Sequence, residues 1–489
     1  VFGAFADEPV ANVNVSEFKG EASVTWGIDL DTERTGFKND AKATLKLNLI
    51  DGGDKSSTGE GVWGEIKIKT DGDTFAKAEG DDALALPGLK VKVDAAKLHF
   101  GENAYIGITS GDTQVGDYKL DTAIAAEKTK NGDKGAVVYL PVSDKNTKEI
   151  NTKYTDGIVA GYGNDLFSVD VDFRSLYWFD LKEQTEDSNI WYGQQYSNAY
   201  SFAIDGALKA VDNLTLKGGY SKDFANKWDE VVTDAFYVAS DYKLGLNDTF
   251  YLKPQVGYVQ EFSKNEYKDG DTSYSWKAND GTLVAALLFG WGDKADSKPG
   301  VFFLDNDDDK KVIPGFSVAM EKQLVYKYTS ESGSDKSETK GTKSPMTLKV
   351  SFFSGEIVEN LTAAAYYETK VGAKDYKKTE NGTDVTPNDS KEEVNPGFAF
   401  AAGLKYKLAA GEGSITPQFG IAMLGGYYGK PAQIDFVGDA YKGEILNLKL
   451  GAEFAGYVEN TTFSVEYASK NLKADDNKGT LNFKCKIAL

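Results

Sequence analysis

Cysteine, histidine and arginine are scarce in this chain of 489 residues, and each scarcity excludes a class of site. The one cysteine, Cys485, cannot form a disulfide within the chain. The one histidine, His99, excludes multi-histidine metal sites and most Ser/His/Asp schemes, and its neighbours predict a strand position. The only arginines are Arg34 and Arg174, so the chain has few side chains that could bind a phosphate group through two parallel hydrogen bonds.

Long apolar runs are also missing. The longest, Leu283–Trp291, falls short of the roughly 20 residues that a membrane-spanning helix needs, but it is long enough for one barrel strand. Mean hydropathy is -0.42, a value expected of a membrane barrel because only alternate residues face lipid. Gly (51 residues) far exceeds Pro (11 residues), which suits many strands joined by tight turns.

Motifs that would carry catalysis or ligand binding fail at the positions that matter. Asp305–Lys311 resembles the start of a calcium loop, but Lys310 stands where Gly is required and Phe316 where Glu is required. Lys340–Lys343 lacks the spacing of a phosphate loop. The net charge of -20 argues against nucleic acid as a partner. We therefore predict no enzyme activity, no cofactor, no metal site and no nucleic-acid partner.

Strict alternation of apolar and polar residues is the pattern that the chain does have. The last residues, Leu481–Leu489, carry an apolar side chain at every odd position. Glu21–Leu30, Phe398–Leu408 and Leu446–Phe454 repeat this pattern, as do about twenty segments in all, at the length of barrel strands. Pro254 stands within one such segment and requires a bulge or an unpaired position.

These segments predict an all-β fold: a large antiparallel transmembrane β-barrel of about 16–22 strands with long polar loops. The polar stretches 144–153, 330–343 and 374–391 are predicted as loops, because they have no apolar stripe. No break in composition marks a second domain, so residues 7–489 are expected to form one barrel. Residues 1–6 contain Ala4-Phe5-Ala6, a small-x-small pattern typical of the end of a secretory signal.

The phase of the stripes assigns side chains to the two faces of the wall. Residues opposite the apolar stripe are candidates to face the lumen: Asp170, Asp172, Arg174, Lys405, Lys407, Lys449 and Glu453. Residues within the stripe are candidates to face lipid: Phe398, Phe400, Leu404, Leu448, Leu450 and Phe483.

The segments Gly20–Leu30, Thr35–Phe37 and Gly61–Ile68 resemble the N-terminal region of the treponemal major outer sheath proteins. This spirochaete family includes the pallidum-repeat proteins and the oral treponeme major surface protein. The resemblance implies an abundant, surface-exposed outer-membrane protein that forms pores as a trimer and contacts host matrix. It also allows an alternative division into an N-terminal periplasmic part and a C-terminal barrel.

Three functions remain open from the sequence. The favoured one is a porin in the outer membrane, surrounded by lipid, which lets ions and small hydrophilic solutes diffuse through a water-filled lumen and is a surface antigen. A second is an adhesin whose loops bind extracellular-matrix proteins of a host. The third is a soluble array of β-sandwiches, whose two-faced strands would give similar stripes.

Overall fold

The computed structural model describes residues 12–30, 33–50, 62–71, 77–78, 84–85, 90–110, 114–123, 147–151, 156–175, 199–225, 232–269, 272–293, 301, 312–342, 346–355, 357–372, 375–387, 398–425, 445–469, 472 and 479–488. The predicted calcium-like segment 305–311 and the predicted signal remnant 1–6 lie outside them. In the described part of the chain, no helix is long and apolar enough to cross a membrane.

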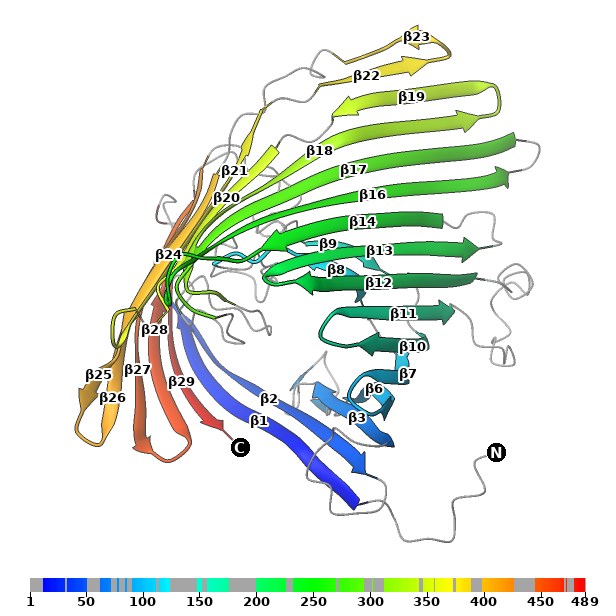
Figure 1. Ribbon diagram of the computed structural model, residues 1–489. Helices are drawn as coiled ribbons and strands as arrows, with labels where there is room; N and C mark the ends of the chain where they lie inside the picture. The colour runs from blue at the N-terminus through cyan, green and yellow to red at the C-terminus, as the bar shows by residue number, and fades with distance from the viewer. Residues whose placement is uncertain are drawn as a thin grey trace.

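The prediction of an all-β antiparallel fold is confirmed by the described residues (Figure 1). Successive pairings lead through β1 (Asn12–Asp29), β2 (Arg34–Ile50), β3 (Val62–Asp71), β6 (Lys90–Phe100), β7 (Ala104–Ser110), β10 (Asp156–Gly163), β11 (Phe167–Ser175), β12 (Ala199–Val211), β13 (Leu214–Ala225), β14 (Val232–Tyr242), β16 (Tyr251–Asp269), β17 (Thr272–Gly290), β18 (Gly315–Ser332), β20 (Met346–Phe353), β21 (Leu361–Val371), β24 (Phe398–Tyr406), β26 (Gly413–Gly425), β27 (Ile445–Val458), β28 (Thr461–Ala468) and β29 (Thr480–Ala488).

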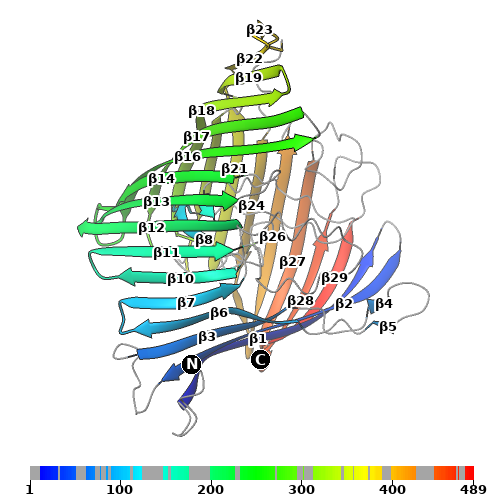
Figure 2. The ribbon, with the colours of Figure 1, turned by 90° about the vertical axis from the view of Figure 1, so that its right-hand side faces the viewer.

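The last of these strands pairs with the first. β29 lies antiparallel to β1, with Ala488 opposite Glu21 and Thr480 opposite Asp29, so the pairings form a ring. The described sheet has 25 strands. Twenty of them form the ring. The other five stand outside the ring or continue one of its strands: β15 (Leu244–Gly245), β19 (Asp335–Thr342), β22 (Asp375–Glu380), β23 (Thr383–Asp384) and β25 (Leu408–Ala410). Figure 2 shows β10 to β18 in front and β24 to β29 behind.

The two ends of the ring differ in how the strands are connected. At one end, which we name the short-turn end, tight turns join β6 to β7, β10 to β11, β12 to β13 and β27 to β28. Asn213 and Asn460 adopt left-handed φ values of 64° and 54° in two of these turns, a conformation that Asn tolerates better than most residues. The opposite end, the long-connection end, has the long segments between β7 and β10, β21 and β24, and β26 and β27. Each end has an exception: the connection between β17 and β18 at the short-turn end is long, and a tight turn joins β16 to β17 at the long-connection end.

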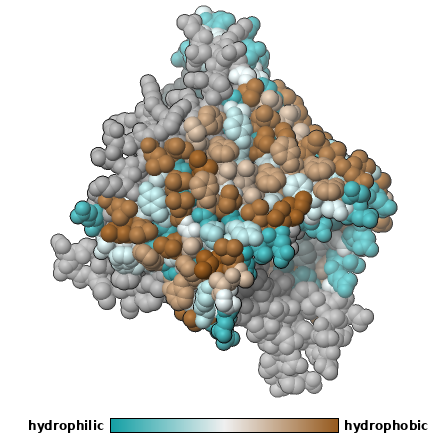
Figure 3. All heavy atoms as spheres, turned by 90° about the vertical axis from the view of Figure 1, so that its left-hand side faces the viewer, coloured by the Kyte–Doolittle hydropathy of each residue, from teal (hydrophilic) through white to brown (hydrophobic). Residues whose placement is uncertain are grey.

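Side-chain exposure on the ring is the reverse of that in a water-soluble core. On β14, Phe236 and Val238 are exposed, whereas the alternating Ala235 and Ala239 are buried. The same pattern recurs on other strands of the ring, and Figure 3 shows large apolar side chains over much of one side of its outer face. The inner face carries most of the buried polar and charged residues of the described chain.

One group of polar residues forms strands where the sequence predicted a loop. Residues 330–342 of the stretch 330–343 continue β18 into a hairpin with β19, which in turn pairs with β22. The prediction was wrong because both faces of this hairpin are polar, so alternation is absent although the backbone ladder is complete. Part of the stretch 374–391 likewise forms β22 and β23, and residues 147–151 of the stretch 144–153 form a short strand, β9.

Candidate functional site

A buried ion pair lies on the inner face of β11. Asp172 and Arg174 are 0% and 1% exposed, and the Arg174 Nη2 atom lies 2.8 Å from Asp172 Oδ2. Arg174 Nε also donates to both carboxylate oxygens, at 2.8 and 2.9 Å. Two residues apart on one strand, the two side chains share a face, as their phase in the sequence predicted. Together they present a neutral, rigid pair to the interior.

Asp170, the third charged residue predicted on this face, accepts a 2.7 Å hydrogen bond from the Tyr105 hydroxyl of β7. The tyrosine reaches across the intervening strand β10 because Gly161 stands between them. A Cβ atom at position 161 would collide with both the Tyr105 ring and the Asp170 carboxylate. The absence of a side chain at Gly161 is therefore what allows this contact.

Charge pairs recur elsewhere on the inner wall. Lys349 of β20 lies 3.9 Å from Glu368 of β21, and both side chains are almost completely buried. Lys449 of β27, a predicted lumen residue, lies 3.0 Å from Glu466 of β28. Because these cations and anions neutralise one another locally, the charge of this wall is far smaller than its number of ionisable groups suggests.

The other predicted lumen residues are not gathered into one cluster. Lys405 and Glu453 are half-buried on β24 and β27. Lys407 is exposed and lies outside the strands, where its backbone N–H donates to the Asn360 carbonyl at 2.9 Å near the short-turn end. The alternation rule placed it on the inner face, but β24 ends at Tyr406 before the rule can apply.

Residues predicted to face lipid lie on the outer face. Leu404, Leu450 and Phe483 are 46%, 44% and 46% exposed. Phe398, Phe400 and Leu448, in phase with them, are half-buried.

A segment inside the ring was not anticipated from the sequence. The connection between β7 and β10 contains β8 (Gln114–Lys119) and β9 (Thr147–Asn151), which pair with each other and contact β12, β13 and β14. Figure 1 shows them beside these strands. Leu120 packs with Tyr237 and Val259, which face inward from β14 and β16. We name residues 114–123 the inward segment.

Polar contacts attach the inward segment to the wall. Gln255 of β16 accepts a hydrogen bond from the Asp121 N–H at 2.7 Å and donates one to the Asp121 carbonyl at 2.8 Å. Lys253 Nζ lies 2.7 Å from the Asp121 carboxylate and 2.9 Å from that of Asp241. The Ala123 N–H donates to Ser317 Oγ at 3.0 Å. These contacts fix both the backbone and the charge of the segment.

The inward segment reaches from one end of the ring nearly to the other. It leaves the wall after Ser110, which pairs with Asp156 at the long-connection end. Its anchors, Lys253 and Gln255, lie just after the start of β16 at the short-turn end. A polypeptide that runs along the interior over this length reduces the open cross-section of the ring.

Two curated proteins match the chain over most of its length. Major surface protein MspTL of Treponema lecithinolyticum is 28% identical, with 94% of this chain and 90% of the relative covered. Major outer membrane protein MspA of Treponema maltophilum is also 28% identical, with 99% and 97% covered. Over nearly its whole length the chain is therefore similar to two major surface or outer membrane proteins of Treponema. The resemblance predicted from the N-terminal segments is thus confirmed, although no family model matches.

Solved structures of outer-membrane porins also align with the chain. OpdQ of Pseudomonas aeruginosa is 10% identical with a TM-score of 0.35, covering 96% of this chain and 97% of the porin. OprD of the same organism is 12% identical with a TM-score of 0.34, covering 98% and 96%. These TM-scores are too low to support a conclusion about the present chain.

Proposed function

We propose that this protein is an outer-membrane porin: a single β-barrel that lets ions and small hydrophilic solutes diffuse passively, and not an enzyme. The observation that carries the proposal is the reversed exposure of the ring, with apolar side chains outside and charged pairs such as Asp172–Arg174 inside. Water around such an outer face would leave a large contiguous apolar patch, which stable monomers avoid. Lipid around it would satisfy the same residues.

The proposed conduction path is the interior of the ring. Rings of 16 or more strands leave room for water, and this ring has twenty in the described residues. The inward segment narrows that path, and paired charges on the wall set its electrostatics. Solutes would therefore be selected first by size and only weakly by charge.

The proposal includes the outer membrane as location, since the relative MspA is named a major outer membrane protein. It places the long-connection end outside the cell, because barrels of this type carry long loops there and short turns on the periplasmic side. The pairing of β1 with both β2 and β29 supports one barrel rather than a separate N-terminal part. The trimer and the surface-antigen role implied by the resemblance also belong to the proposal.

Conductance of the detergent-extracted protein in planar bilayers tests this function. We expect discrete, long-lived channel openings, and particle images with threefold symmetry. Protein that is folded and inserted but never conducts would contradict the porin proposal and indicate a closed barrel that serves as a scaffold. Protein that stays monodisperse in buffer without detergent would favour the sandwich alternative. In the described residues no contact singles out a host matrix protein as a ligand.

A further inference from the structure

Three neighbouring strands are much longer than a membrane requires. β16 and β17 have 19 residues each and β18 has 18, whereas a tilted barrel strand crosses a bilayer in about 9–11. Their surplus lies at the long-connection end, where β19 and β22 extend the same sheet (Figure 1). This part of the wall, residues 272–278, 326–342 and 375–381, is named the rim sheet.

The side chains on the outer face of the wall change from apolar to polar where the rim sheet begins. Lower on β17, Leu287 is exposed outside, and Val284 and Leu288 are buried inside. On the rim sheet the outer position is taken by the exposed Lys277. Trp276 continues the inward phase of Val284, because alternate residues of a strand share a face. The outward positions of the rim sheet are therefore polar, and its inward positions include aromatic rings.

Tyr328 joins Trp276 on this inner face. A bulge in β18 shifts the register between Gly281 and Thr282, which turns the even-numbered residues beyond it inward. The Trp276 and Tyr328 rings stack with centroids 6.1 Å apart and planes at 27°. Both side chains remain partly exposed. Aromatics of an interfacial belt would face lipid, so these two inward-facing rings do not belong to such a belt.

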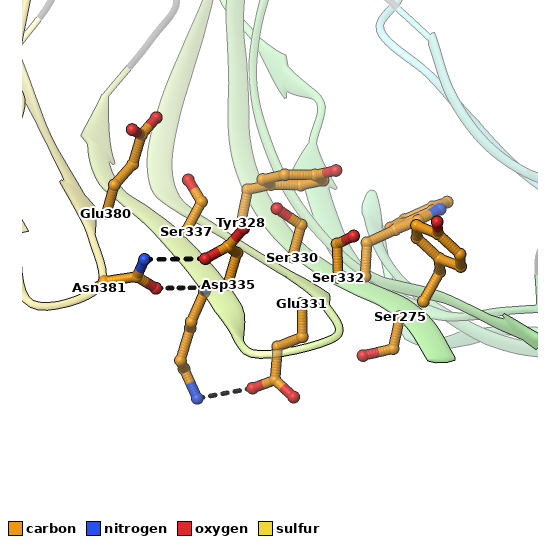
Figure 4. A pocket seen from close by; sticks show the side chains of 12 residues that line it. Ser275, Tyr328, Ser330, Glu331, Ser332, Asp335, Ser337, Glu380 and Asn381 are labelled. Carbon is orange, nitrogen blue, oxygen red and sulfur yellow. Dashed lines mark hydrogen bonds and ion pairs between the residues drawn. The ribbon is translucent and has the colours of Figure 1, made fainter. Parts of the chain in front are cut away.

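The rings border a groove of about 470 Å³ at the edge of the rim sheet. Ser330, Ser332 and Ser337, which Figure 4 labels, line the groove. Tyr274 lines it as well. An aromatic floor with hydroxyl groups at its border offers one apolar surface and several directional polar contacts, the usual composition of a small-molecule site.

The carboxylates of the groove already have partners. Glu331 lies 2.6 Å from Lys336, and Glu380 lies 2.6 Å from Lys378. Asp335 accepts a 3.1 Å hydrogen bond from the Asn381 amide, as Figure 4 shows. These contacts compensate most of the negative charge and leave a small negative excess, so the groove is suited to a neutral ligand with many hydroxyl groups.

We propose that the rim groove binds a neutral oligosaccharide. The C–H face of a sugar ring would lie on Trp276 and Tyr328, and its hydroxyl groups would bond to the serines and to the oxygens of Glu380 and Asp335. Anionic glycans are disfavoured because three of the lining side chains are carboxylates, against one lysine. This binding would occur on the cell surface, separately from conduction.

An array of neutral, sialylated and sulfated glycans, probed with the labelled full-length protein in detergent, tests the proposal. We expect retention on neutral glycans, weakened about tenfold by Trp276→Ala. Trp276→Phe should lose less, because an aromatic face remains. Ser273→Ala, on the opposite face of the same strand and outside the groove lining, is the matched control and should bind like the wild type.

Single-channel conductance of each variant shows whether the barrel is intact. Normal conductance with lost binding supports the groove. Equal binding by the wild type and Trp276→Ala would overturn it, as would retention on sialylated or sulfated glycans only, or the absence of retention on any glycan. If the wild type does not conduct, the porin proposal is overturned, but the result of the glycan array still tests the groove by itself.

Discussion

Leu404 and Lys405 are neighbours on β24 that face opposite sides of the wall. Leu404→Arg would place a charge against hydrocarbon at a cost of about 2–4 kcal/mol near the middle of the bilayer, so we expect less assembled protein. Lys405→Glu should assemble normally and shift ion preference toward cations. Heat-modifiable migration on gels measures assembly, and reversal potential measures preference. Equal loss of assembly in both variants would refute the assignment of faces.

The Asp172–Arg174 pair makes a second prediction at this scale. Arg174→Met would leave a carboxylate buried without its cation, and we expect a loss of about 3–5 kcal/mol in unfolding free energy. The double variant Asp172→Asn, Arg174→Met removes both charges and should recover much of that loss. Urea unfolding of the detergent-folded protein compares them. A double variant as unstable as the single one would show that the pair is not the cause.

Glu331 and Lys336 make the hairpin of β18 and β19 sensitive to pH. Their contact lowers the pKa of Glu331 below its ordinary 4.5 and raises that of Lys336. A carboxyl with a lowered pKa stabilises the fold above its unfolded pKa and loses this contribution as pH falls through the folded value. The wild-type hairpin should therefore be better protected from hydrogen exchange than Glu331→Gln at neutral pH. The difference should vanish in acid; if it persists there, the ion pair is not responsible.

At the scale of elements, the anchor of the inward segment can be broken by one substitution. Lys253→Met leaves the Asp121 and Asp241 carboxylates to repel each other, so we expect the segment to detach and the lumen to widen. The largest neutral polyethylene glycol that enters the channel measures width independently of charge. Lys405→Met, which removes a lysine from another part of the inner wall, is the control. An unchanged size limit in Lys253→Met would mean that the segment does not restrict the path.

The sequence predicted strands well wherever one face of a strand meets lipid. The stripe of Phe398–Leu408 became β24 and β25, and Pro254 lies where the ladder is interrupted, between the pairs Gln255–Asp241 and Leu252–Leu244. Alternation disappears in the hairpin after Ser330 because water touches both faces there. Strand prediction from this signal therefore fails beyond the apolar band.

The inward segment escaped prediction for a different reason. Its anchors are contacts between Asp121 and Gln255, residues 134 positions apart that nothing local relates. A weak signal existed: Leu120 and Ala123 form a short apolar patch within a long polar connection. Such a patch has no use on a solvated loop, so it could have indicated a buried contact.

Ion selectivity depends on the charge distribution of the whole molecule. The chain carries a net charge of -20, and a cation preference would follow if that charge acted on the pore. Charges in the loops are screened over roughly 8 Å at physiological ionic strength, and several charges on the wall are paired, as Lys349 is with Glu368. We expect a weak preference for cations that grows as salt is diluted, measured as the reversal potential in potassium chloride gradients at two mean concentrations. A strong preference that does not change with salt would place unpaired charges at the constriction, and an anion preference would contradict the prediction outright.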